Sequence, residues 1–98
     1  MSARISIVPE ARRQLRAAAA WWAEYRPAAR DLFRQEIRIA AEQLRAAPLS
    51  GIRHNRRVRT VLLRKTRYQL FYAYVGSINT IVIVAVWSTS RGEAPPLG

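Results

Sequence analysis

Hydrophobic residues follow two different spacings along this chain, and the change falls near residue 51. Before it, apolar side chains recur every three or four residues, which is typical of helices that bury one face. After it, hydrophobic and polar residues alternate, as they do in the strands of a sheet. The pattern therefore predicts a mainly helical first half and a β-sheet second half.

The first half is predicted to contain a short strand at Arg4–Val8 and then two helices. Pro9 suits the first position of a helix, and this helix ends near Tyr25-Arg26-Pro27, because the residue before a proline avoids helical backbone angles. The second helix is expected from about residue 28 to 46. Its buried stripe is Phe33, Ile37, Ala40 and Leu44. The short connection predicts that the helices pack antiparallel as a hairpin.

Three strands are predicted in the second half, at residues 58–64, 68–75 and 81–87. Residues 76–79 have the composition of a hairpin turn. The last strand is apolar without interruption, as a central strand that is covered on both faces would be. Residues 88–98 contain prolines and glycines, so we expect an extended or mobile tail.

These elements predict one α+β domain over residues 1–98, in the order β-α-α-β-β-β. A helical hairpin would pack on one face of a small antiparallel sheet. Two helices can cover only one face, and the other face still carries aromatic and aliphatic side chains. Because monomers rarely expose a large apolar surface, a partner is expected on that face.

Composition excludes several kinds of site. The chain has no cysteine and a single histidine, His54, which excludes disulfides, thiolate metal sites and a histidine-built zinc site. No metal or cofactor is therefore expected. Asp31 is the only aspartate, so a serine-histidine-aspartate triad has no support, and no glycine-rich phosphate loop is present. With no leader-like or membrane-spanning segment in the sequence, we expect a cytoplasmic protein with no membrane contact.

Positive charge is the strongest compositional feature. Sixteen arginines and one lysine face six acidic residues, a formal net charge of +11. Residues 53–67 hold seven basic residues and no acid: Arg53, Arg56, Arg57, Arg59, Arg64, Lys65 and Arg67. Such a run forms a solvated rim, docks an acidic partner, or contacts nucleic acid, and composition leaves all three open.

Three further features have two interpretations each. His54 is an ordinary surface histidine or takes part in recognition or proton transfer. Trp21, next to Trp22 on the first helix, belongs to the edge of the core or anchors an interface. Arg34 and Arg38 continue a stripe from Arg30 that is a solvated face or a groove for an acidic segment.

The order and spacing of several motifs resemble the RelE/ParE superfamily of bacterial type II toxins. These motifs are Trp21-Trp22, Phe33-x-x-Glu36-Ile37, Ala47-Pro48-x-x-Gly51, Val58-Arg59, Leu62-Leu63-Arg64, Tyr68-Gln69-Leu70-Phe71-Tyr72, Ile83-x-x-Val86-Trp87 and Arg91. The likeness runs from residue 4 to about residue 91, which is nearly the whole chain.

This resemblance implies a growth-inhibiting toxin that is neutralised by an antitoxin encoded beside it. In such pairs the C-terminal segment of the antitoxin wraps the toxin, and here that segment should be acidic or amphipathic. The candidate antitoxin- or target-binding residues are Trp21, Arg34, Arg38, Arg56, Arg57, Arg59, Arg64, Arg67 and Arg91.

The superfamily divides by mechanism. RelE-like members cut mRNA on the ribosome with basic residues of the sheet and an aromatic or basic residue in the tail. The corresponding positions here are Thr60, Leu62, Gln69, a position near Thr89, and Pro95. Only Arg64, Arg91 and His54 remain as candidates for ribonuclease chemistry.

ParE-like members lack that residue set and act on DNA gyrase, which they stall on cleaved DNA. The resemblance therefore favours a ParE-like toxin that is not an enzyme. The alternatives are a ribosome-dependent mRNA interferase and an inactive member that only binds its antitoxin.

Overall fold

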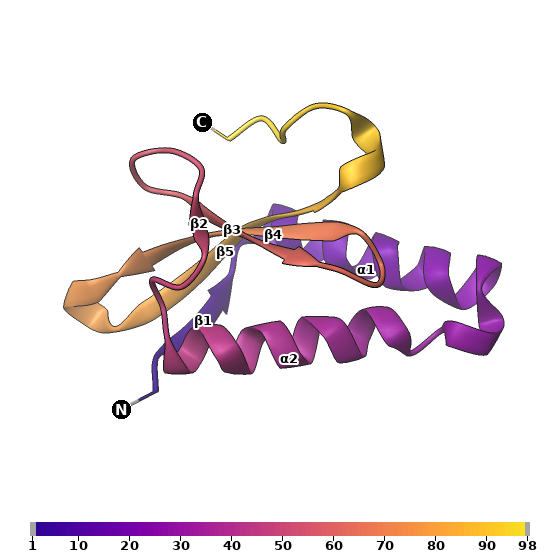
Figure 1. Ribbon diagram of the computed structural model, residues 1–98, viewed down its shortest axis with the longest axis horizontal. Coiled ribbons are helices and arrows are strands. Elements are labelled where there is room, and N and C mark those ends of the chain that lie inside the picture. Colours follow the sequence, from indigo (N-terminus) through magenta and orange to yellow (C-terminus); the bar gives the residue numbers. More distant parts are fainter. Residues whose placement is uncertain (1, 98) are drawn as a thin grey trace.

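The computed structural model describes residues 2–97 and contains two helices and five strands. The elements are β1 (Arg4–Ile7), α1 (Pro9–Tyr25), α2 (Leu32–Ala46), β2 (Ile52–Arg53), β3 (Arg59–Leu63), β4 (Tyr68–Val75) and β5 (Thr80–Ser88). Figure 1 shows both helices on one face of the sheet, running in opposite directions, with the C-terminal tail on the other face. The predicted α+β class and element order are confirmed, with β2 as an additional short strand.

The sheet is mixed, whereas the sequence predicted a purely antiparallel one. Its strand order is β1-β5-β4-β3-β2, and β1 pairs with β5 in parallel while the other pairs are antiparallel. Parallel neighbours need a long connection between them. Here the whole chain between β1 and β5 supplies it, and the residue pattern within a strand does not specify so distant a partner.

The connection between the helices differs from the prediction. The second helix was expected from about residue 28, but α2 begins at Leu32. Pro27–Ala29 instead forms a single 3₁₀ turn, in which the Ala29 amide donates to the Arg26 carbonyl at 2.9 Å. Proline fits the first position of such a turn, and the tighter turn reverses the chain before α2 starts.

An irregularity in β5 explains how this strand buries both faces. Phe71 of β4 pairs with Ala85 and Tyr72 pairs with Ile83, so Val84 is an extra residue opposite them. The strand changes its alternation at this bulge. Ile83 before it and Val86 after it both join the core between sheet and helices. Ala85 and Trp87 pack in a second cluster on the opposite face, so both faces of β5 are covered, as the apolar run predicts.

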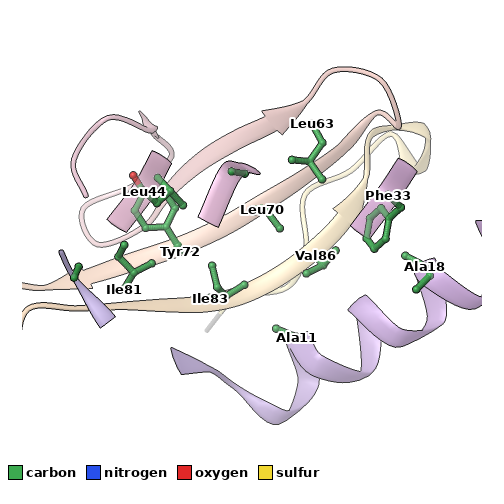
Figure 2. Packing of buried hydrophobic residues seen from close by; sticks show 13 residues of the cluster. Ala11, Ala18, Phe33, Leu44, Leu63, Leu70, Tyr72, Ile81, Ile83 and Val86 are labelled. Atoms are coloured by element: carbon green, nitrogen blue, oxygen red, sulfur yellow. The ribbon is translucent and has the colours of Figure 1, made fainter. Parts of the chain in front are cut away.

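The main core lies between the helices and the sheet. The largest fully buried side chains are Tyr72, Phe33, Leu44 and Ile81. The predicted stripe of α2 is confirmed, since Phe33, Ala40 and Leu44 are buried and Ile37 packs against them. Figure 2 shows Phe33 and Leu44 on α2 in the same cluster as side chains of the sheet.

A second, smaller cluster lies on the open face of the sheet, away from the helices. It consists of Val58, Phe71, Ala85 and Trp87, and the tail residue Leu97 packs against it. The Trp87 indole N–H donates to the Glu93 carbonyl at 2.8 Å. The tail thus begins with a 3₁₀ turn at Thr89–Arg91 and then returns along the open face, where it covers part of the apolar surface that we expected a partner to cover.

Candidate functional site

The loop between β2 and β3 holds the densest group of basic side chains. It is fixed by backbone bonds, because the amides of His54 and Asn55 both donate to the Val58 carbonyl, at 2.8 and 3.1 Å. The Asn55 side-chain oxygen accepts hydrogen bonds from the amides of Arg57 (2.9 Å) and Val58 (2.8 Å). This turn gives the arginines of the loop a defined backbone to project from.

Four arginines surround a hollow of about 480 Å³ between this loop and the end of β4: Arg53, Arg56, Arg57 and Arg59. Arg56 and Arg57 are exposed, whereas Arg59 is half-buried and donates to the Gly51 carbonyl at 2.9 Å. Among residues 2–97, no acidic side chain lines this hollow. The site is therefore built to receive negative charge.

A second basic group occupies the turn between β3 and β4 and includes Arg64, Lys65 and Arg67. Glu36 of α2 holds this turn, because its carboxylate accepts hydrogen bonds from the amides of Lys65 and Thr66, both at 2.9 Å. The Thr66 hydroxyl donates to the same carboxylate at 2.7 Å. Arg67 has a φ of 63°, a left-handed conformation that a tight turn requires, and its side chain is exposed.

The contact between the Glu36 carboxylate and the turn between β3 and β4 should be sensitive to acid. Burial alone would raise the pKa of this carboxyl, but the hydrogen bonds from Thr66 and Lys65 and the Lys65 charge outweigh it, so the pKa lies below its ordinary value of 4.5. A carboxyl whose pKa is lower in the folded than in the unfolded protein contributes its full stabilisation at pH values above the pKa of the unfolded state. This contribution is lost as the pH falls through the pKa of the folded state.

We therefore expect Glu36→Gln to destabilise the protein at neutral pH, with a gap to the wild type that narrows as the pH falls below about 4.5. Urea unfolding at a series of pH values measures this gap. Glu42→Gln, which removes an exposed partner of Arg45, is the control and should change stability by less than about 0.5 kcal/mol. A Glu36→Gln gap that stays constant with pH would show that the carboxylate charge does not stabilise the turn.

The hollow between α2 and β3 combines apolar and basic groups. Ile39, which is 59% exposed, and Leu62, which is 37% exposed, line it together with Arg64 and Lys65. Arg34 and Arg38 are exposed on the same helix, which fits both interpretations of their stripe. A surface of this composition suits an amphipathic segment that carries acidic residues.

Aromatic side chains extend along the exposed side of α1. Trp21 is 44% exposed, and its ring lies 5.3 Å from that of Tyr25. Trp21 also lines a hollow with Tyr68 and Arg91 that runs along most of α1, from Glu10 to Trp21. Burial raises the pKa of the Tyr68 hydroxyl, although the nearby Arg91 charge opposes the shift. An exposed tryptophan beside a hollow is a suitable interface anchor.

The open face of the sheet contains the remaining candidates. His54 is exposed and its ring lies edge-on to Phe71, with ring centres 5.1 Å apart. The Arg91 guanidinium stacks on the Trp87 ring at 4.0 Å. This cation–π contact holds the first turn of the tail, which contains Arg91, against Trp87 of β5.

A hollow of about 420 Å³ on this face brings together Thr60, Gln69 and Thr89, three of the positions that the resemblance marks for ribonuclease chemistry. The side chains at these positions are neutral. Arg53, His54 and Glu93 line the same hollow, whereas Arg64 and Arg91 line two other hollows. The three ribonuclease candidates, Arg64, Arg91 and His54, are thus not gathered around one cavity.

Within residues 2–97, His, Asp and Glu side chains do not gather in groups of three that could hold a metal ion. Neither α1 nor α2, the helices of the described chain, has the length and hydropathy that crossing a bilayer requires.

Sequence reasoning missed two structural contributors to these sites. The first is Glu36, which orders the basic turn although it lies 30 residues away along the chain from Thr66, whose amide it binds. The second is the tail, which covers part of the open face. A cue was available for the basic loop, since Asn55 two residues before Arg57 is the signature of a side-chain-capped turn.

The fold is that of the RelE/ParE toxins. The chain is similar to the chromosomal ParDE toxin–antitoxin system of P. aeruginosa, with a TM-score of 0.70 at 16% identity, over 89% of this chain and 96% of that one. It is also similar to the toxin–antitoxin complex RelBE2 of Mycobacterium tuberculosis, with a TM-score of 0.65 at 21% identity, over 90% and 99% of the two chains. A mutant of the E. coli toxin RelE in the free state gives a TM-score of 0.61 at 14% identity, over 93% and 87%. Identities this low show the fold alone.

The family follows from the sequence. A family model described as the ParE toxin of the type II toxin–antitoxin system parDE matches residues 5–92. The chain therefore belongs to the ParE toxin family of type II toxin–antitoxin systems. No curated protein sequence gives a significant match to it.

Proposed function

We propose that this protein is the toxin of a type II pair and inhibits growth by poisoning DNA gyrase. Family membership supports this proposal. The observation that carries it is the hollow of the open face, where Thr60 and Gln69 stand at positions that are basic in ribonuclease members of the superfamily. Neutral side chains there cannot stabilise the charge that develops on phosphate during RNA cleavage.

Ribosome-dependent mRNA cleavage is the second candidate, and one observation favours it. His54 and Arg53 line the open-face hollow beside Trp87, so an acid–base group and a cation lie near an aromatic ring. General acid–base catalysis needs a proton donor and a proton acceptor at the same reacting atom. Arg64 and Arg91 line other hollows. The open-face hollow therefore lacks two of the three side chains that could serve ribonuclease chemistry, which makes this candidate the weaker one.

The proposal is tested with purified toxin in two parallel reactions. In the first, gyrase supercoils relaxed plasmid. We expect the toxin to inhibit supercoiling and to cause cleaved plasmid DNA to accumulate in the reaction. In the second, translating ribosomes carry a labelled mRNA, and we expect the RNA to stay intact. Cleavage of the RNA at codon positions with unimpaired supercoiling would overturn the proposal. A folded toxin that is inert in both reactions would overturn it as well and would support an inactive, antitoxin-binding member.

We further propose that the antitoxin's C-terminal segment binds across the hollow between α2 and β3 and over Trp21. The exposed apolar side chains Ile39 and Trp21 would bury its apolar positions, and Arg38 and Arg64 would pair with its acidic ones. The free-energy gain would come from the apolar anchors, whereas the charges would set orientation and association rate.

Ile39→Asp is expected to weaken antitoxin binding at least tenfold, roughly 1.4 kcal/mol, because it places a charge at an apolar anchor. Ile39 is exposed in the free toxin, so the fold should be retained. Calorimetric titration with the product of the adjacent antitoxin gene measures the change. Gln35→Asp adds the same charge at another exposed position of α2 and should leave affinity nearly unchanged. Equal affinity for Ile39→Asp and wild type would place the antitoxin elsewhere.

A further inference from the structure

We propose that the loop between β2 and β3 is a cradle for the phosphodiester backbone of duplex DNA, with Arg56 and Arg57 as its phosphate-binding residues. The proposal rests on the proposed function in naming DNA, since a gyrase poison acts where DNA is held. It adds that the toxin itself contacts the DNA. Figure 1 shows this loop projecting from the sheet, on the face away from the helices.

The loop is organised before any ligand binds. The Asn55 side-chain oxygen accepts from two backbone amides of the loop, so the nitrogen of the same carboxamide remains available as a donor. Two amides at the start of the loop converge on the Val58 carbonyl and close it. A phosphate that binds here does not have to order the backbone first, which removes a cost that flexible basic tails incur.

The four arginines of the hollow have two different tasks. Arg59 donates to the Gly51 carbonyl at 2.9 Å, and Arg53 donates to the Arg56 carbonyl at 3.3 Å, so both are engaged in holding the loop to the sheet. Arg56 and Arg57 are exposed, and within residues 2–97 their guanidinium groups make no hydrogen bond or ion pair. They are therefore the groups that reach a ligand.

The positive charge of this hollow is not balanced within the described chain. Both ion pairs found among residues 2–97 lie on the helices, between Arg13 and Glu10 and between Arg45 and Glu42. Acidic side chains are absent from the lining of the hollow in the same part of the chain. Four guanidinium groups around one cavity repel one another, and a bound polyanion relieves that repulsion.

Charge density favours DNA over an acidic peptide as this polyanion. Duplex DNA presents one negative charge for about every 1.7 Å of its axis. An extended peptide advances about 3.3 Å per residue, so even a continuous acidic run presents half that density.

The test measures binding of a fluorescent duplex of about 20 base pairs to the toxin alone, by anisotropy, between about 50 and 200 mM salt. We expect Arg56→Gln/Arg57→Gln to weaken binding about tenfold or more at the lowest salt. The slope of log K against log salt should fall by about 1.8, because two phosphate contacts are lost. Arg56→Lys/Arg57→Lys should restore most of the slope, since lysine still neutralises phosphate.

Arg12→Gln/Arg16→Gln is the matched control. It removes the same charge from exposed positions of α1, and we expect affinity to fall less than about threefold. Equal losses for both double variants would overturn the cradle, because they would report net charge alone. Unchanged binding in Arg56→Gln/Arg57→Gln would overturn it too.

Two competing ligands complete the experiment. A poly-glutamate peptide or a single-stranded RNA of the same charge that binds the wild type more tightly than duplex DNA would overturn the assignment to DNA. Preference for the duplex, lost in Arg56→Gln/Arg57→Gln, is the expected result. Failure of the proposed function is a separate outcome, because gyrase is absent from these measurements and inhibition of supercoiling is measured without reference to DNA affinity.

Discussion

Phe33→Ala is expected to lower the free energy of unfolding by about 3–5 kcal/mol. The Phe33 side chain is fully buried between α2 and the sheet, and its ring meets that of Tyr68 edge-on at 5.0 Å. Truncation removes the buried ring and leaves a cavity that the surrounding strands cannot close. Since domains of this size are stabilised by about 5–15 kcal/mol, the variant should lose a large part of its stability.

Urea unfolding followed by tryptophan fluorescence measures this effect. Ile39→Ala is the control on the same helix, and because Ile39 is 59% exposed its cost should stay near or below about 0.5 kcal/mol. Similar costs for the two variants would contradict the placement of the α2 stripe against the sheet.

Tyr72→Phe is expected to cost about 2–3 kcal/mol although it removes a single oxygen. The Tyr72 hydroxyl accepts a hydrogen bond from the Gly51 amide at 2.9 Å and donates to the Pro48 carbonyl at 2.7 Å. Both partners belong to the segment that joins α2 to β2, and both lose their partner in the variant. Burial raises the pKa of this hydroxyl, against the effects of the Gly51 amide and the nearby Arg59 charge, so it stays protonated and able to donate at neutral pH.

The close approach of the Tyr72 hydroxyl to the segment between α2 and β2 also explains the glycine at position 51. A Cβ there would lie 2.5 Å from the Tyr72 hydroxyl and 2.9 Å from the Thr60 carbonyl, so no larger residue fits without moving the ring or the strand. Tyr74→Phe is the control for the tyrosine prediction, because the Tyr74 hydroxyl donates to the Asn79 side chain in a partly exposed position. It should cost about 0.5–1.5 kcal/mol. A Tyr72→Phe cost no greater than this would show that water replaces the lost bonds.

Local patterns were sufficient to predict most of the elements. The 3.6-residue stripe of α2 and the alternation in β4 depend on which side of each element meets the core. The spacing of apolar residues within each segment is enough to identify that side. The pattern failed where structure depends on distant partners. Strand β2 consists of only Ile52 and Arg53, which pair with β3, and two residues carry no periodicity.

The mixed sheet and the course of the tail were also beyond the pattern. Strand β1 pairs with β5, more than seventy residues later, as the register of Arg4 with Thr80 shows. The tail follows the open face because Leu97 packs on the small cluster around Trp87. Neither contact has a local signature in the sequence.

For the candidate sites, the sequence identified the basic residues but not their separate tasks. Arg57 and Arg59 are equivalent as members of a charged run. In the structure Arg57 is exposed, whereas Arg59 is half-buried and bonded to the Gly51 carbonyl. Substitution of Arg59 would therefore disturb the fold as well as any binding, and Arg56 and Arg57 are the informative positions.

The central claim, that this ParE-family toxin inhibits growth through gyrase, is tested most directly in cells. The chain is induced without an antitoxin, and incorporation of labelled thymidine and labelled leucine is followed over the first minutes. We expect thymidine incorporation to fall first while leucine incorporation continues. An early loss of leucine incorporation with DNA synthesis intact would contradict the account and direct attention to His54 and Arg53 at the open-face hollow.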